Sequence, residues 1–575
     1  MVHLRPGVRR RVCQQVAHPD GRAHDLQPAL LRHLLERPGS DSPGRRPFIE
    51  VVRGPGATLW GANAVNGVIN IITKSAEDTQ GFLFETGYST NDNLPWAAFR
   101  YGDELSDDAW FRVWGKWFDR DGGAFGNGED FPDDWDALRG GFRVDWRPSS
   151  DDEFMFKGNY FKGHAEELNQ FVVLTPPYLV PRDQTVGHAG WFLQGRWSHS
   201  ISTDQDLTLQ LYFDHTERHQ DLLGQSVDTF DFDFQHRFHL GEDHELIWGV
   251  GYRYTADSND NSFDIFFTPS SRETQLLSAF IQDTITLAED ELFLTIGSKF
   301  EHNDFSGFEV QPNVRLLWAP NPAHTLWTAV SRAARTPGRV DHDVGVTLTP
   351  IPPMGMIPLS LVTFSGDDGV VSEDVTAFEV GYRVRPDDNL SFDLALFYNH
   401  YDNLRTAEVG APVVTIGPMG PIVFIPATFD NKARGQVYGA ELAVQWRVTD
   451  NWRLAGSYSY TETDIDPLSQ SADPTARSPE DDYPRHQLNV RSYWDVTDEL
   501  QLNSVIYFVD EIQNRRVSEY LRWDVQVAWQ ATEWMQVTAG VQNILDGRHD
   551  EYGPTLNRPA AEIERLAYLS LEFTF

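Results

Sequence analysis

Most of the chain after residue 80 consists of short segments in which apolar and polar residues alternate. In the segment 206–214, one face carries only apolar side chains: Leu207, Leu209, Leu211 and Phe213. The same period of two recurs in the segments 291–298, 391–400, 486–496, 500–508, 521–530 and 534–542. A period of two over so many segments predicts β-strands with one apolar face and one mixed or polar face.

The connections between these segments are of two kinds. Some are short and polar, as within 145–154, 447–454, 495–502 and 530–537, whereas 336–372 and 406–431 are long and irregular. Short turns at one end and long loops at the other are typical of a transmembrane β-barrel. At about 22 residues for each strand with its connection, residues 80–575 predict an all-β, antiparallel barrel of about 22 strands.

Composition excludes several other classes. The formal net charge of −38 argues against nucleic-acid binding, and no apolar run is long enough for a membrane-spanning helix. The content of 36 Phe, 19 Tyr, 18 Trp and 44 Gly favours strands and turns over disorder. Cys13 is the single cysteine, so neither an internal disulfide nor a cysteine metal site is expected. A soluble β-propeller or stacked sandwich remains an alternative source of many strands.

The chain divides by composition into three zones. Residues 1–47 are rich in Arg, His and Pro and show no apolar periodicity or signal-peptide core. Residues 48–79 form a short apolar block with several glycines, and residues 80–575 carry the alternating segments. The chain ends RLAYLSLEFTF, an alternating strand that stops on Phe575. This ending resembles the sorting signal of bacterial outer-membrane proteins.

The block 49–75, IEVVRGPGATLWGANAVNGVINIITKS, resembles the end of the plug domain of TonB-dependent outer-membrane receptors. Physically it reads as two strands separated by a break at Arg53–Gly56, with glycines that permit close approaches. Segments further on also resemble strands of that family's barrel: 311–337, 372–383, 438–448 and 539–546. The resemblance implies a barrel containing a plug remnant, ligand capture outside the cell, and uptake driven by the inner-membrane TonB complex.

Residues 1–47 depart from that family, which has a signal peptide, a TonB box and a full plug at this point. With permissive codons, reading residues 2–47 one base later gives a sequence that resembles the missing middle of a plug. We therefore hypothesise a frame-shifted or misassigned start for 1–47. Stop codons in the alternative frame of the gene would refute this.

The family resemblance also implies a plug–barrel lock. In the family, a plug arginine in an RGP context pairs with barrel glutamates. The matching residues here are Arg53, Glu379 and Glu441. A buried ion cluster of this kind stabilises only if every member is paired. The alternative is that Arg53 caps its own loop.

Two expected outer loops, 344–362 and 409–428, are unusually apolar. Exposed apolar patches usually mark binding surfaces, so these loops would line a vestibule for a ligand with apolar parts. Alternatively, they pack on one another as a lid.

Four polar segments contain residues that could bind a metal ion. The acidic loops 127–136 and 255–264 could bind calcium, but their spacing differs from the EF-hand, which favours a solvated acidic surface. The histidine motifs 215–219 and 341–343 could hold a transition metal, although isolated surface histidines are commoner. We expect no metal site, no cofactor and no enzymatic arrangement.

The sequence thus predicts a monomeric receptor in the outer membrane of a Gram-negative bacterium. Its expected partners are TonB, membrane lipid and a small ligand, most simply a ferric siderophore or similar metal chelate. The ligand-binding residues remain unknown at this point. Three alternatives stay open: a passive channel, a non-functional truncated receptor, and a soluble β-rich binding protein or glycosidase.

Overall fold

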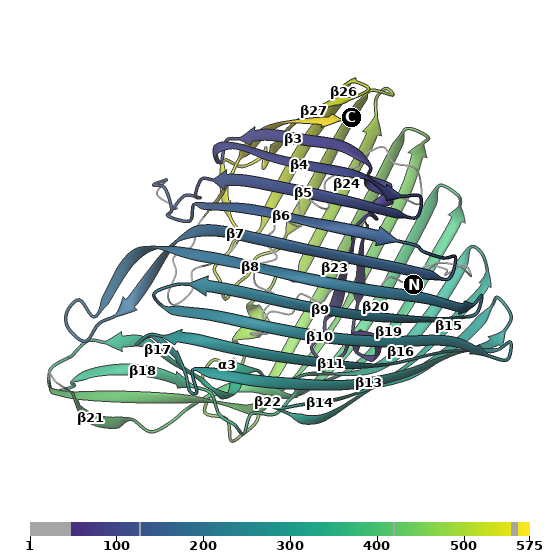
Figure 1. Cartoon of the computed structure of the whole chain (residues 1–575). Helices are drawn as coiled ribbons and strands as arrows, with labels where there is room; N and C mark the ends of the chain where they lie inside the picture. Colours follow the sequence, from purple (N-terminus) through teal and green to yellow (C-terminus); the bar gives the residue numbers. More distant parts are fainter. Residues whose placement is uncertain (1–47, 126–127, 418–419, 552, 554–561) are drawn as a thin grey trace.

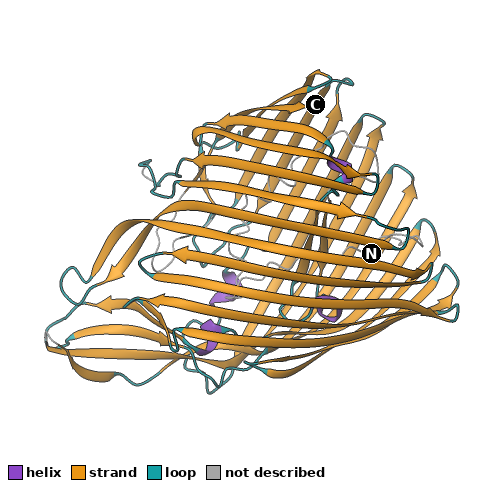
Figure 2. Ribbon diagram, in the orientation of Figure 1, coloured by secondary structure: helices purple, strands orange, loops and turns teal. Residues whose placement is uncertain are grey.

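The computed structural model describes residues 48–125, 128–417, 420–551, 553 and 562–575. These residues form a large β-barrel with an inserted segment inside it (Figure 1). Strands dominate the described chain and helices are very short (Figure 2). In that part of the chain, no helix has both the length and the apolar character needed to cross a membrane.

The barrel is closed and has 22 antiparallel strands, as predicted. Its first half consists of β3 (Gly81–Ser89), β4 (Asp92–Ser106), β5 (Ala109–Arg120), β6 (Trp135–Trp146), β7 (Asp152–Val172), β8 (Leu179–Ser202), β9 (Gln205–His219), β10 (Leu223–Leu240), β11 (His244–Asn261), β13 (Ser271–Ala288) and β14 (Leu292–Asn303). Its second half consists of β15 (Gly307–Asn321), β16 (His324–Arg335), β19 (Glu373–Asp387), β20 (Leu390–Val409), β22 (Gly420–Thr449), β23 (Trp452–Pro467), β24 (His486–Asp495), β25 (Leu500–Val509), β26 (Tyr520–Thr532), β27 (Met535–Gln542) and β30 (Leu566–Thr574).

The period of two in the sequence becomes the two faces of this wall. Large apolar side chains such as Leu138 and Phe156 point outward and are exposed, whereas inward side chains such as Asp145, Gln194 and Gln311 are fully buried. An apolar outside and a polar inside are what a lipid-embedded barrel requires. The closed barrel rules out the soluble propeller or sandwich.

Closure of the barrel depends on the C-terminal strand. β30 pairs with β27 on one side and with β3, the first barrel strand, on the other. The Phe575 ring lies 6.3 Å from that of Phe82 and 5.9 Å from that of Trp534. The terminal aromatic residue therefore packs at the seam where the two ends of the barrel meet.

The two rims of the barrel differ as predicted. Turns such as 203–204 and 450–451 are short, whereas the opposite rim carries the long connection 336–372, which begins and ends at the expected residues. The second predicted long loop, 406–431, was wrong in its bounds. Its apolar and β-branched residues pair as strands, so β20 continues to Val409 and β22 begins at Gly420.

The long connections build a small sheet that extends the outer rim. β12 (Ile265–Phe267) pairs with β17 (Val344–Ile351), which pairs with β18 (Leu359–Ser365). β18 pairs in parallel with β22, whose other neighbour here is β21 (Val413–Gly417). The two apolar loops therefore pack on one another, as the second alternative expected, and they do so as a sheet that continues the rim.

The tip of the β7–β8 hairpin packs against this outer sheet. Val172 forms a buried cluster with Leu359, Leu361 and Ile422. Its backbone N–H also donates to Asp264 Oδ1 at 2.8 Å. In Figure 1 the ends of β7 and β8 accordingly reach the region of β17, β18 and β21.

The inserted segment, residues 48–80, enters the bore of the barrel (dark purple in Figure 1). It contains β1 (Phe48–Arg53), α2 (Ala57–Trp60), β2 (Gly67–Ile72) and η1 (Glu77–Thr79). The remaining described elements lie in connections: α3 (Arg339–His342), η2 (Ser478–Asp481), β28 (Arg548–Asp550) and β29 (Glu562–Glu564).

Candidate functional site: contacts between the inserted segment and the barrel

The inserted segment folds locally as a hairpin. β1 and β2 pair antiparallel from Phe48 opposite Ile72 to Arg53 opposite Gly67. Gly54 follows with φ +68°, a left-handed conformation that favours glycine. After this turn the chain leaves β1 and enters α2. The strand, break and strand expected from the sequence are therefore present.

Gly54 lies directly against the barrel wall. A Cβ atom at this position would overlap the carboxylate of Glu379, which is buried on β19. Among the described residues, Glu379 Oε2 has no hydrogen-bond partner. Arg315 attracts this carboxylate electrostatically, whereas Glu441 repels it.

The predicted lock is only partly visible in this geometry. Glu379 lies at the inserted segment, and Glu441 occupies an inward position on β22, because its neighbour Leu442 is exposed on the outside. The backbone of Arg53 pairs with Gly67, but its side chain lies outside what the structure describes. The three-residue lock stays a prediction.

A second carboxylate, Glu301 on β14, holds the turn after α2. The backbone N–H of Ala62 donates to Glu301 Oε2 at 2.7 Å, and Gln311 Nε2 donates to the same oxygen at 2.8 Å. The ammonium group of Lys299 lies 3.9 Å from Glu301 Oε1. Gly61 packs so closely on Glu301 that a larger residue would displace it.

Asn63 joins the same turn to the base of the long outer connection. Its backbone N–H donates to the carbonyl of Ala334 at 2.8 Å. The N–H of Thr336 donates to Asn63 Oδ1 at 3.1 Å, and Asn63 Nδ2 donates to Thr336 Oγ1 at 3.3 Å. The inserted segment therefore contacts the first residues of the 336–372 connection.

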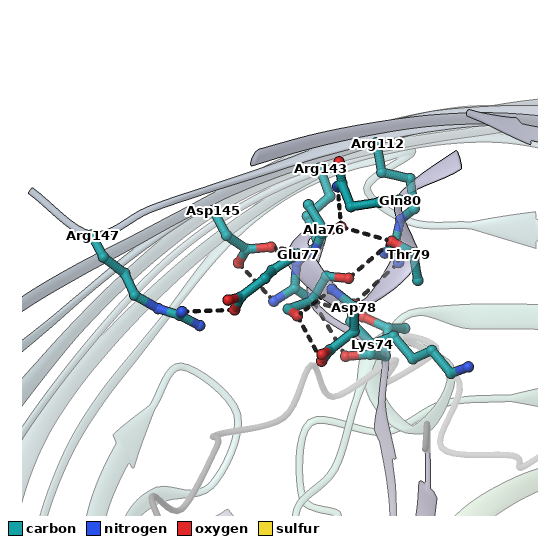
Figure 3. A network of polar contacts seen from close by, with 12 residues as sticks. Lys74, Ala76, Glu77, Asp78, Thr79, Gln80, Arg112, Arg143, Asp145 and Arg147 are labelled. Carbon is teal, nitrogen blue, oxygen red and sulfur yellow. Dashed lines mark hydrogen bonds and ion pairs between the residues drawn. The ribbon is translucent and has the colours of Figure 1, made fainter. Parts of the chain in front are cut away.

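A third contact holds the last part of the inserted segment. Here residues 73–80 bond to side chains on or next to β5 and β6, and we call this network the clamp (Figure 3). Asp145 is completely buried and accepts two hydrogen bonds of 2.8 Å from the guanidinium of Arg143. Asp145 Oδ2 also accepts the N–H of Ala76 at 2.6 Å. Arg143 in turn donates to Thr73 Oγ1 at 3.0 Å.

Two further arginines extend the clamp. Arg112 Nη1 donates at 3.2 Å to the carbonyl of Lys74 and to Thr79 Oγ1. Arg147 Nη1 lies 2.7 Å from Glu77 Oε2, at the partly exposed edge of the network. The clamp thus fixes the backbone of the inserted segment at several successive residues just before β3 begins.

Sequence reasoning missed the clamp. The available signal was the pair Arg143 and Asp145 at i and i+2 of a strand, with the apolar Val144 between them. Charged residues two apart on one strand share a face, so this pair indicated a polar contact inside the barrel. The partner of Asp145 in the inserted segment, however, is the backbone N–H of Ala76, and no residue pattern identifies a backbone group.

Outside the bore, α3 is anchored by buried carboxylates. Asp341 accepts the N–H of Gly338 at 2.9 Å and pairs with Arg405 and, at 3.4 Å, with Arg335. Burial raises the pKa of Asp341, but the two arginines outweigh it and hold the pKa below its usual value. Asp343 pairs with Arg272 at 2.8 Å and with Arg339 at 2.7 Å.

Residues of the two histidine motifs that could bind a metal ion already contact other protein groups. In the motif 341–343, Asp341 and Asp343 face arginines, and His342 Nε2 lies 3.0 Å from the carbonyl of Val370. His215 contacts Asp228 and Glu217 through its two ring nitrogens, at 2.7 and 3.1 Å. Within the described ranges, no three His, Cys, Asp or Glu side chains are grouped to hold a metal ion.

The acidic stretch 255–264 is less solvated than expected. Asp257 pairs with Arg339 at 2.9 Å, and buried Asp264 receives the Val172 N–H. These carboxylates have internal partners, so the expectation of a solvated surface was wrong for both. The start of the other acidic loop, at residue 127, lies outside the described residues.

Comparison with known proteins gives a consistent result. A family model, TonB dependent receptor-like, beta-barrel, matches residues 76–544. The iron-regulated outer membrane virulence protein of Vibrio cholerae serotype O1 is 25% identical over 563 residues, covering 90% of this chain and 80% of that protein.

Solved structures show the same fold. A mutant ferric enterobactin receptor from Pseudomonas aeruginosa superposes with a TM-score of 0.70 at 18% identity, covering 92% of this chain and 85% of that one. The siderophore receptor PirA from Acinetobacter baumannii gives a TM-score of 0.71 at 16% identity, with the same coverage.

The chain therefore belongs to the TonB-dependent receptor β-barrel family. It is a receptor of the Gram-negative outer membrane that serves ligand uptake across that membrane.

Proposed function

We propose that this receptor takes up a ferric siderophore or a similar metal chelate, with energy supplied by the TonB complex. The similar proteins named above are iron-regulated or siderophore receptors, which supports this class of cargo. The observation that carries the proposal is the inserted segment in the bore, which packs against Glu379 and is hydrogen-bonded to Glu301 and to Asp145 of the clamp. A passive channel has no need of an element that occupies its bore.

In this proposal residues 48–79 are the end of a plug domain, and residues 80–575 are the barrel around it. Arg53 pairs with Glu379 and Glu441, which would complete the hydrogen bonding of the buried Glu379 carboxylate. Residues 1–47 lie outside the described residues, and the hypothesis of a frame-shifted start stays with them. The receptor acts as a monomer and catalyses no reaction.

Uptake experiments test the cargo and its energy source. The chain would be expressed in a Gram-negative strain that lacks its own ferric siderophore receptors, and uptake of radioactive iron chelates would be followed. We expect uptake that disappears when the TonB gene is deleted. Uptake that continues without TonB, or no uptake of any ferric chelate, would refute the proposal.

Conductance in planar bilayers separates the receptor from a passive channel. Because the inserted segment occupies the bore, the purified chain should be almost silent. Steady, large single-channel currents from the unmodified chain would favour the passive channel instead.

A further inference from the structure

A cavity of about 620 Å³ lies in the outer rim, away from the inserted segment. Three groups of residues build its walls: the connection 262–268, the stretch 342–347 from α3 into β17, and the end of β18 at 363–366. Phe424 of β22 completes the lining. No described residue of the inserted segment contributes to this cavity, so the outer connections and β22 form it.

Four phenylalanines dominate the lining: Phe263, Phe266, Phe364 and Phe424. Phe263 and Phe266 are 50% and 39% exposed, so they stand at the opening and not in a closed core. Gly345 leaves room for the Phe266 ring, since a Cβ atom there would overlap it. A cavity of this size with mostly apolar and aromatic walls is typical of a small-molecule site.

The charges around the cavity are already compensated. Asp343 is the only acidic residue of the lining, and its carboxylate pairs with both Arg272 and Arg339. The lining contains no Lys or Arg, and His342 directs Nε2 to the carbonyl of Val370. The cavity therefore offers no free charge to a carboxylate, a phosphate or a bare metal ion.

The polar side chains that remain carry hydroxyls: Thr268, Thr363 and Ser365. The hydroxyls of Ser262 and Thr347 also line the cavity but already bond to the backbone of 263–265. Hydroxyls both donate and accept hydrogen bonds, so they suit a neutral oxygen or nitrogen on the ligand. Aromatic walls favour a flat ring, because ring pairs add about 0.5–1.5 kcal/mol beyond the area that they bury.

The position of the cavity ties it to ligand capture. The connection 262–264 holds the β7 end through Asp264, and the stretch 342–347 follows α3, whose residue Asp341 pairs with Arg335 at the top of β16. The cavity thus lies among the outer connections, on the rim that carries the long connection 336–372.

We propose that this cavity binds a neutral aromatic ring carried by the chelate, while the metal centre stays outside it. This inference rests on the proposed uptake function, which it deepens by assigning an aryl-bearing ligand class. Phe263 and Phe266 receive the ring at the opening, and the hydroxyls contact its substituents. Specificity for the ring is thereby set in the outer rim and not at the inserted segment.

Two matched iron complexes test this proposal: ferric tris(benzohydroxamate) and ferric tris(acetohydroxamate). Both are neutral and bind iron through the same atoms, and they differ only in a phenyl ring against a methyl group. Binding to the purified receptor would be measured by quenching of tryptophan fluorescence and by calorimetry. We expect the phenyl complex to bind about tenfold more tightly.

The double variant Phe263→Ala, Phe266→Ala should abolish that preference, and Phe266→Leu should lower it while keeping an apolar wall. Phe308→Ala is the matched control, because Phe308 is an exposed phenylalanine outside the cavity lining and its loss should leave the preference unchanged. Equal binding of the two complexes, or an unchanged preference in the double variant, would overturn the inference. Either result would leave TonB-dependent iron uptake standing, whereas a preserved ring preference without any chelate uptake would refute the proposed function.

Discussion

Two buried carboxylates of the barrel each receive one backbone N–H of the inserted segment, and their surroundings differ. Asp145 accepts Ala76 at 2.6 Å and is neutralised by two hydrogen bonds from Arg143. Glu301 accepts Ala62 at 2.7 Å, but its cation, Lys299, lies 3.9 Å away. The clamp is therefore a completed ion pair, and the contact at Glu301 is a looser one.

This difference indicates how the inserted segment can be held and still move. A buried charge stabilises only when it is paired and hydrogen-bonded, and losing one partner costs much more than losing a surface pair. At the clamp Asp145 and Arg143 neutralise each other through two hydrogen bonds, whereas Glu379 beside Gly54 is attracted by Arg315 but repelled by Glu441. We expect residues 54–66 to leave the wall more easily than residues 73–80.

The largest effect is expected from Asp145→Asn. The substitution removes the charge that pairs with buried Arg143 and weakens the acceptor of Ala76. Loss of one partner of a buried pair costs about 3–5 kcal/mol. Hydrogen exchange of a peptide covering 73–80 should therefore become orders of magnitude faster. Asp466→Asn is the control, because the pair Asp466–Arg477 is exposed; equal effects of the two variants would contradict the clamp.

A smaller effect is expected from Gly54→Ala. The left-handed backbone costs a non-glycine residue roughly 1–2 kcal/mol, and the new Cβ would also displace the Glu379 carboxylate. Openings of the bore in planar bilayers should become frequent. Gly307→Ala is the control for the cost of the left-handed backbone alone, because Gly307 has φ +74° and open space around it. If both variants stay equally silent, Gly54 does not seat the segment.

Glu301→Gln should have a weaker effect than either. The amide keeps one oxygen for the N–H of Ala62 and loses the charge. Hydrogen bonds to a charged group are stronger than neutral ones by about 1 kcal/mol. Exchange of the peptide covering 54–66 should rise about fivefold, with no change at 73–80. A rise at both places would show that the two contacts open as one unit.

The smallest effect concerns pH and the anchor of α3. The pKa of Asp341 is lowered in the folded protein, so its contribution to stability is present above its ordinary value of 3.8 and lost as the pH falls through the lower folded value. Exchange at 339–343, corrected for intrinsic rates, should be unchanged from pH 7 to 5 and rise below about pH 4. Asp341→Asn should raise exchange already at pH 7; an unchanged acid response in this variant would assign the response to other groups.

The barrel itself could be predicted from the sequence because alternation is a local property. Each strand shows its two faces in its own residues, such as Leu207, Leu209 and Leu211, and the closed wall follows from repeating the pattern. The C-terminal strand was also expected from its alternation, whereas the packing of Phe575 on Phe82 at the barrel seam came only from the structure.

What could not be predicted depends on contacts between distant residues. The parallel pairing of Leu359–Ser365 with 422–428 converts two expected loops into one sheet, and neither stretch shows its partner. The clamp joins Asp145 to a backbone N–H of residue 76. The candidate lock residues came from family resemblance; Glu379 lies at Gly54, while the pairing with Arg53 awaits a test.

Hydrogen exchange at two single amides tests the central comparison most directly. In the unmodified receptor, the N–H groups of Ala62 and Ala76 would be followed under identical conditions, for example by fragmentation mass spectrometry. We predict that Ala62 exchanges at least tenfold faster than Ala76, because the carboxylate that holds Ala76 is the fully paired one. Equal protection of both amides, or faster exchange at Ala76, would contradict the account.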